Sequence, residues 1–455
     1  MPRLISLLSV LALFLAPYRA SAADAKPNIV IILADDLGYH DSSPYRSDDV
    51  RTPNFKRFAE AGCKFTHVFV ASPSCAPSRA ALLTGLMPAR NGAEANHARP
   101  RADIKKWPAY FKDLGYETAA FGKVAHYKHG DLYGFDTVDE RGQSAEAVGE
   151  FLAKRDRKKP LCLLVGTHDP HVPWPENDGY DAATIEPPST HVDTPQTRAY
   201  RAQYYTAVSR ADSWLGEVFD LTREKLGPNT LFVFTSDHGA QWPFGKWNLY
   251  DAGIRVPFLA VWPDVIEPGA SCDALVSWVD LLPTLVEVAG GSAPRGLDGR
   301  SFAAILRGQS DVHLDRIFAT HTNDGNMNVY PCRCVRTREW KYILNLHPEW
   351  EHTTHIDRAK PRDGLGYWTS WVKQAMTDRA AAAIVKRYHQ RPREELYDLT
   401  ADPHEQHNIA GDRRNAERLA QMRADIERWM QDQSDTQKVF GKPRTLGESA
   451  LSGER

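Results

Sequence analysis

The chain has 455 residues, of which 42% are hydrophobic and 25% charged, and its formal net charge is −2. This length and apolar content predict a large buried core, with one large domain and a smaller partner. The near-neutral charge argues against nucleic acid or an anionic membrane as a partner, so any attraction for an anion must come from a local cluster of positive charge.

Residues 1–22 have the pattern of a secretory signal peptide. Arg3 precedes an apolar run from Leu4 to Ala16, and small residues follow at Ala20-Ser21-Ala22. The run is too short for a spanning helix, and no other segment is apolar over a sufficient length, so we expect no membrane span. We predict a secreted or periplasmic protein whose mature chain begins near Ala23. Its six cysteines are too few for a disulfide scaffold.

Three apolar segments are typical of buried parallel strands, and each ends in polar residues: NIVIILADD (28–36), LCLLVGTHD (161–169) and TLFVFTSDH (230–238). Helical patterns lie between them, at 52–62, 105–115 and 200–227. This alternation predicts an α/β fold, with a large, mostly parallel mixed sheet sandwiched by helices. The carboxyl ends of such strands share one edge of the sheet, where we expect the active site.

A different pattern begins after residue 320. Residues 332–346 alternate like an antiparallel strand, 394–410 read as a strand and a turn, and 415–432 form an amphipathic helix. We therefore predict a catalytic domain at 23–320 and a smaller C-terminal α+β subdomain with an antiparallel sheet at 321–433. A polar tail at 434–455 is expected to be disordered.

The segment SCAPSRAALLTG (74–85) places a thiol at the start of a predicted helix. Pro77 suits a first helical turn, and Gly85 is a plausible end. Arg79 lies four residues after Cys75, so both face the same side, and a helix amino end with an arginine makes an anion site. The alternative is a buried structural cysteine with Arg79 in a surface salt bridge.

This Cys-x-Pro-Ser-Arg pattern, followed by Leu-Thr-Gly, resembles that of the type I sulfatases, the formylglycine-dependent branch of the alkaline phosphatase superfamily. The resemblance extends in order along nearly all of the mature chain. It implies that Cys75 is oxidised to formylglycine during export, by a formylglycine-generating or anaerobic maturation enzyme. A hydroxyl of the hydrated aldehyde then attacks sulfur.

The resemblance also implies a metal site for one Ca²⁺. Its ligands are Asp35, Asp36, Asp237, His238 and the modified residue 75. Many members carry asparagine where this chain has His238, and a nitrogen donor is less typical for Ca²⁺. The identity of the metal therefore stays open.

Further family segments supply cations and proton-transfer groups. Lys123 and His126 lie in FGKVAHY, which has one more residue before the histidine than the usual family segment, and Lys246 lies in a later matching stretch. The resemblance implies that Arg79, Lys123 and Lys246 stabilise the sulfate. It assigns His126 to proton acceptance as sulfate is released, and His168, with Lys246, to protonation of the leaving group. The alternative is a surface lysine and a structural histidine.

The segments THDPH, NLYDAG and VYPCRCV are similar to those of the heparan N-sulfatase (sulfamidase) branch. They imply a sulfated carbohydrate as the substrate, cut at either O- or N-sulfate. We expect exo action and take His171, His321 and Arg333 as substrate-binding candidates. Aromatic residues in predicted loops either stack on sugars or belong to the core; they are Trp242, Phe244, Trp247, Tyr250, Trp368 and Trp371. Two alternatives are a phosphoesterase or phosphonate monoester hydrolase of the same superfamily and a catalytically silent glycan-binding homologue.

Overall fold

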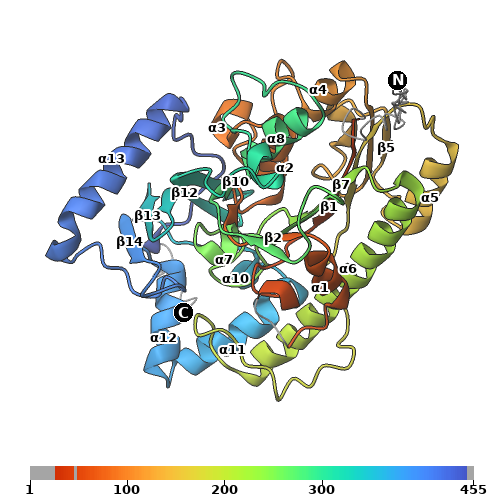
Figure 1. The fold of residues 1–455 in the computed structure, drawn as a ribbon. Helices are drawn as coiled ribbons and strands as arrows, with labels where there is room; N and C mark the ends of the chain where they lie inside the picture. Colours follow the sequence, from red (N-terminus) through yellow and green to blue (C-terminus); the bar gives the residue numbers. More distant parts are fainter. Residues whose placement is uncertain (1–25, 46–48, 448–455) are drawn as a thin grey trace, which may run out of the picture.

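The computed structural model describes residues 26–45 and 49–447, so the predicted signal peptide lies outside the described residues. Its centre is an eight-stranded mixed sheet (Figure 1). The strands, in spatial order, are β5 (Thr137–Asp139), β4 (Glu117–Gly122), β6 (Leu161–Gly166), β1 (Asn28–Ala34), β7 (Thr230–Ser236), β8 (Phe258–Val261), β2 (Cys63–Phe65) and β9 (Ala270–Cys272). The strands from β5 to β7 run parallel, and β8 is antiparallel to both β7 and β2.

Helices cover both faces of this sheet, as predicted (Figure 1). On one side lie α1 (Pro53–Glu60), α5 (Ala145–Lys154) and the long α6 (Pro195–Leu226). On the other lie α2 (Cys75–Thr84), α3 (Pro88–Asn91), α4 (Trp107–Asp113) and α8 (Leu281–Val288). Because the central strands are buried on both faces, their sequences are continuously apolar rather than alternating.

The ends of three central strands meet at one edge of the sheet, as expected. The backbone N–H of Asp35 donates to the carbonyl of Asp169 at 3.2 Å, and that of Asp237 donates to the carbonyl of Ala34 at 3.3 Å. The polar residues that follow β1, β6 and β7 are therefore held beside one another.

The C-terminal part contains the predicted antiparallel sheet, which has four strands. These are β11 (Arg316–Asp324), β12 (Asn328–Thr337), β13 (Trp340–Asn345) and β14 (Glu394–Asp398). Helix α13 (Ala416–Asp432) packs on this sheet, while α10 (His355–Arg358), α11 (Leu365–Ala375) and α12 (Arg379–His389) extend toward α6. Since β11 begins at Arg316, a boundary between residues 320 and 321 falls inside a strand.

The described part of the polar tail, residues 434–447, is mostly exposed but is attached to the protein at several points, whereas disorder was expected. Asp435 forms a buried ion pair with Arg333, in which Oδ1 accepts from Nη2 at 2.9 Å. Farther along, Thr445 forms a β-bridge with Trp350. The composition of this segment is polar because it binds through charges and backbone groups.

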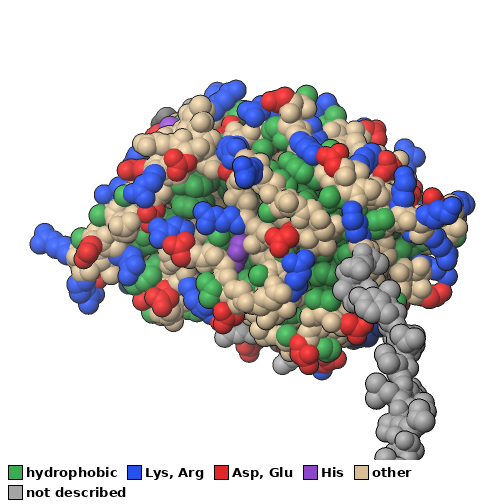
Figure 2. All heavy atoms as spheres, turned by 45° about the horizontal axis from the view of Figure 1, so that its top comes forward, with side chains coloured by type: hydrophobic (Ala, Val, Ile, Leu, Met, Phe, Trp, Pro, Cys, Tyr) green, Lys and Arg blue, Asp and Glu red, His purple; other side chains and the backbone are tan. Residues whose placement is uncertain are grey.

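On the face drawn in Figure 2, basic and acidic side chains are intermixed and no broad area carries one sign. Helices long and apolar enough to cross a membrane are not found among the described residues.

Candidate active site

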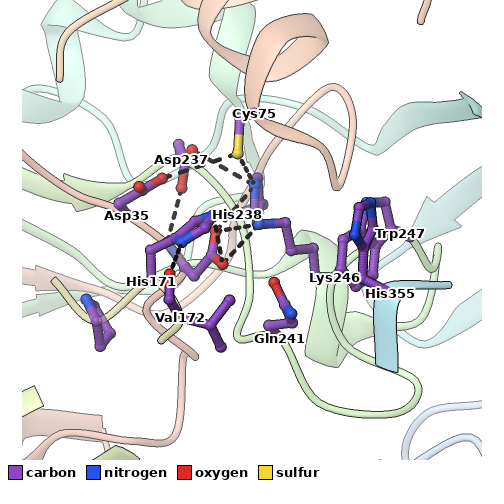
Figure 3. A network of polar contacts seen from close by, with 12 residues as sticks. Asp35, Cys75, His171, Val172, Asp237, His238, Gln241, Lys246, Trp247 and His355 are labelled. Atoms are coloured by element: carbon purple, nitrogen blue, oxygen red, sulfur yellow. Dashed lines mark hydrogen bonds and ion pairs between the residues drawn. The ribbon is translucent and has the colours of Figure 1, made fainter. Parts of the chain in front are cut away.

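Cys75 is the first residue of α2, and its side chain is buried at the carboxyl edge of the sheet (Figure 3). As predicted, the helix runs to Thr84 and ends at Gly85, whose φ of 65° lies in the left-handed region that glycine tolerates. The Sγ atom lies 3.3 Å from Nε2 of His238 and 4.0 Å from both Oδ1 of Asp35 and Nζ of Lys123.

Carboxylates and cations are paired around this thiol, all of them buried. Arg79 Nη2 donates to Asp35 and Arg79 Nε to Asp237, each at 3.0 Å, which excludes the alternative of a surface salt bridge. Lys123 Nζ also donates to Asp35. Lys246 Nζ donates to both carboxylate oxygens of Asp36, at 3.0 and 2.7 Å (Figure 3).

These pairs keep the carboxylates of Asp35 and Asp36 ionised, whereas burial outweighs Arg79 and raises the pKa of Asp237. Burial raises the pKa of Asp35, but the charge of Lys123, followed by His171 and Arg79, outweighs burial and leaves the pKa well below its ordinary value. Burial likewise raises the pKa of Asp36, and Lys246 is the largest opposing charge, so this pKa is also lowered. The cations therefore supply the countercharge that buried carboxylates require.

A group of four residues offers ligand atoms for a cation. Oxygen, nitrogen and sulfur atoms of Asp36, Cys75, Asp237 and His238 lie within 4.8 Å of one another. Burial lowers the pKa of His238, but Asp237 and Asp36 outweigh burial and raise it to about 9. The donor set fits a hard divalent cation held by carboxylates, with one nitrogen ligand. Asp35 lies outside this group because Arg79 and Lys123 hold its carboxylate.

His168 and His126 lie beside the cluster, on either side of Tyr127. The rings of Tyr127 and His168 stack with centroids 5.8 Å apart, and His126 meets Tyr127 edge-on at 5.0 Å. Burial lowers the pKa of His168, and it lowers that of His126 to about 2 with further contributions from His97 and Lys123. Both histidines are therefore uncharged near neutral pH.

His171 also joins the site, whereas two other substrate-binding candidates do not. Nε2 of His171 lies 3.9 Å from Asp36, and burial lowers the pKa of His171 to about 4. His321 lies buried, with Nε2 2.6 Å from the side-chain oxygen of Asn328. Arg333 is 1% exposed, and its guanidinium binds Asp435 and the carbonyls of His321 and Cys332. In the described part of the chain, no hydrogen bond or ion pair links His321 or Arg333 to the cluster.

The aromatic residues of the predicted loops belong to the core, which decides between the two alternatives that the sequence left open. All six are buried, namely Trp242, Phe244, Trp247, Tyr250, Trp368 and Trp371. The aromatic residue that the sequence interpretation missed is Tyr127, which is 46% exposed, with its hydroxyl 3.3 Å from Lys123 Nζ. It lies within the FGKVAHY segment, next to His126.

His97 and Asp324 were also missed. His97 Nδ1 lies 2.6 Å from His126 Nε2, and His97 Nε2 lies 3.3 Å from Asp324 Oδ1. Neither residue stands in a segment that the sequence pattern singled out, and their proximity arises only when β11 folds against the main domain.

Buried cations and carboxylates around one thiol, at the carboxyl edge of a mixed α/β sheet, define an enzyme site for an anionic group. The sulfatase family model matches residues 27–292, and a model described as N-sulphoglucosamine sulphohydrolase, C-terminal, matches residues 238–362. The chain belongs to the sulfatase family and is a sulfuric ester hydrolase.

Two curated relatives and one solved structure illustrate this similarity. An ulvan-active sulfatase of Formosa agariphila is 34% identical, covering 93% of this chain and 84% of the relative. The N-sulphoglucosamine sulphohydrolase of Homo sapiens is 28% identical, covering 90% and 91%. A structure solved with its substrate D-glucosamine-2-N,6-O-disulfate has a TM-score of 0.68 and 20% identity, covering 90% of this chain and 99% of that chain. These matches agree with the sulfamidase-like resemblance and the predicted fold.

Proposed function

We propose that this protein removes sulfate from a sulfated glycan by exo action, using formylglycine at position 75 and one bound Ca²⁺. The observation that carries this proposal is the position of Cys75, 3.3 Å from His238 and 4.0 Å from Asp35 and Lys123. Formylglycine at this position would supply a hydroxyl for attack on sulfur, and the metal would supply Lewis-acid polarisation of the sulfate. Asp36, Asp237 and His238 hold the metal, with Asp35 beside them.

The chain's own cations bind and orient the sulfate. The ammonium groups of Lys123 and Lys246 are buried against Asp35 and Asp36, respectively. Arg79 fixes Asp35 and Asp237 from the second turn of α2. Positive charges held in place before the reaction stabilise the charge that develops on the leaving oxygen, because they do not need to reorient.

The histidines beside Tyr127 transfer protons. His168 is partly exposed and protonates the leaving sugar oxygen or nitrogen, while the buried His126 accepts a proton as sulfate is released. The exposed ring of Tyr127 provides an apolar face for a sugar next to both residues. The names of the relatives support a glycan substrate, with either an O- or an N-sulfate.

The predicted signal peptide supports export to the periplasm or the medium, and a maturation enzyme would act on Cys75 during export, before folding is complete. Burial of the thiol supports this order, because the folded chain covers it.

The test combines mass spectrometry with substrate turnover on protein secreted by its own host. The peptide with Cys75 is expected to have lost sulfur and gained one oxygen, and the protein to release sulfate from ulvan oligosaccharides or N-sulfoglucosamine. Cys75→Ala is expected to abolish turnover, whereas Cys334→Ala, a control at another buried thiol, retains it. An active protein with an unmodified thiol would contradict the mechanism.

Two further outcomes identify the alternatives. Faster hydrolysis of aryl phosphates or phosphonates than of sulfates would assign a phosphoesterase. Glycan binding without turnover by protein that carries formylglycine would assign a silent binding homologue.

A further inference from the structure

The side chains of Asp324, His97 and His126 form a line that begins at the C-terminal sheet and ends at His126. Asp324, the last residue of β11, has Oδ1 3.3 Å from Nε2 of His97. Nδ1 of His97 lies 2.6 Å from Nε2 of His126. The other nitrogen of His126, Nδ1, is buried and has no hydrogen-bond partner among the residues that the structure describes. The line therefore ends at a single unpartnered nitrogen.

The carboxylate at one end determines where the protons lie. An ionised carboxylate only accepts hydrogen bonds, so the facing Nε2 of His97 carries a proton. When His97 is neutral, its Nδ1 is an acceptor, and Nε2 of His126 donates to it. The lone pair of His126 is then on Nδ1, the atom without a partner.

Asp324 is well suited to this role because it is held in place and kept ionised. Its Oδ2 accepts from Nε1 of Trp247 at 2.8 Å and lies 3.4 Å from Nε2 of His355, whose ring stacks on Trp247 (Figure 3). Burial raises the pKa of Asp324, but the bonds with His355, His97 and Trp247 outweigh burial and keep it below its ordinary value.

His97 is placed by an unusual backbone conformation. Its φ is 66°, in the left-handed region that residues other than glycine rarely adopt. The preceding residue is tied to β11, since the N–H of Asn96 donates to the carbonyl of Asn323 at 3.0 Å. Such a conformation persists only where the surrounding structure holds it.

We infer that His97 and Asp324 are positioning residues that set the tautomer of His126 and stabilise the charge it acquires on accepting a proton at Nδ1. This inference deepens the proposed function, in which His126 is that acceptor. A carboxylate orients the base histidine of serine hydrolases in the same way, although here a second histidine lies between the two groups.

The surroundings of His126 show why such support is needed. The groups that face it are His97, Lys123, His129, Arg79 and the ring of Tyr127. Burial lowers the pKa of His126, and Lys123, His129 and Arg79 lower it further, so none of these three groups stabilises the protonated ring. Asp324, acting through His97, is the acidic group on the line described above.

The first test is a direct measurement of the tautomer, independent of catalysis. In protein labelled with ¹⁵N-histidine, the signals of His126, assigned with His126→Gln, are expected to show a protonated Nε2 and an unprotonated Nδ1. His97→Gly is expected to give a mixture of both tautomers. Glycine suits the φ of 66°, so this variant removes the ring without straining the backbone. An unchanged tautomer in His97→Gly would overturn the inference.

The second test is kinetic. His97→Gly is expected to lower kcat about 10–100-fold, the usual effect of removing an orienting partner, with KM little changed. Because the side chain of His97 is 62% exposed, added imidazole can enter the vacated space and is expected to restore part of kcat. His407→Gly is the matched control, since it removes another exposed histidine that faces a carboxylate, Asp402, and leaves Asp324 and the line to His126 unchanged.

An equal loss of kcat in His407→Gly and His97→Gly, with no rescue by imidazole, would refute the relay and indicate a structural role. A wild-type protein without sulfatase activity would instead refute the proposed function, and the tautomer measurement would still decide the inference.

Discussion

Replacing Lys246 by methionine removes the charge that neutralises Asp36 while keeping the length of the side chain. Lys246 Nζ lies 2.7 Å from Asp36 Oδ2, and the two side chains are 2% and 1% exposed. Breaking a buried ion pair costs about 3–5 kcal/mol, because a charge is left without compensation. Unfolding entropy is about 2.1 cal/mol/K per residue, or roughly 0.9 kcal/mol/K for this chain, so the melting temperature is expected to fall by about 3–6 °C.

Calcium should reverse part of this loss. A bound Ca²⁺ supplies the countercharge that Lys246 provides in the metal-free protein, so the deficit in melting temperature is expected to shrink when the ion is added. Turnover is expected to stay low, because the variant lacks the positive charge of Lys246 that would stabilise the sulfate. A decrease of about 10²–10³-fold in kcat is expected.

The assay is thermal unfolding of both proteins in chelator and in Ca²⁺, followed by sulfate release. Lys105→Met is the control: Lys105 pairs with Asp113 on the surface, where the side chains are 44% and 66% exposed, so little change is expected. The reasoning fails if Lys246→Met and the wild type have the same melting temperature in chelator, or if Ca²⁺ raises the melting temperature of both proteins equally.

Three further changes test other contacts. Tyr127→Ala should raise KM about two- to tenfold through loss of a stacking face, whereas Tyr127→Phe should not; equal KM values for wild type and Tyr127→Ala would refute this role. Arg79→Lys should lower both melting temperature and turnover, because lysine cannot bridge Asp35 and Asp237; unchanged unfolding would contradict this. Asp435→Asn should lower the melting temperature by several degrees. Burial raises the pKa of Asp435, but the opposing effect of Arg333 is larger, so the pKa is lowered. The difference in melting temperature between the variant and the wild type should therefore be complete above about pH 4 and vanish as pH falls through the lowered pKa. A difference independent of pH would exclude the ion pair as its cause.

Much of the site was predictable because its residues follow regular patterns along the chain. Asp35 and Asp36 come directly after an apolar run, and so does Asp237. Parallel strands in one sheet bring such ends to a common edge, so their convergence follows from the fold class. The helix start at Cys75 and its end at Gly85 are likewise local properties of proline and glycine.

Only the tertiary structure decided which polar side chains pair with each other when they lie far apart in the sequence. The polar tail was expected to be disordered, yet Asp435 pairs with Arg333. Charge composition does not reveal whether the folded protein places an opposite charge beside a given residue. The loop tryptophans were ambiguous for a similar reason: aromatic side chains suit both a core and a sugar site, and burial depends on which elements pack over them.

The line from Asp324 through His97 to His126 shows most clearly what the sequence predicts and what only the tertiary structure decides. The sequence by itself identified the strand ends, the helix that presents Cys75, and His126 as a candidate. Apolar periodicity determines which face of an element is buried, so it could specify this framework. The exposure of Tyr127 and the contacts that orient His126 depend on how the C-terminal sheet packs against the main domain, and only the tertiary structure decided them.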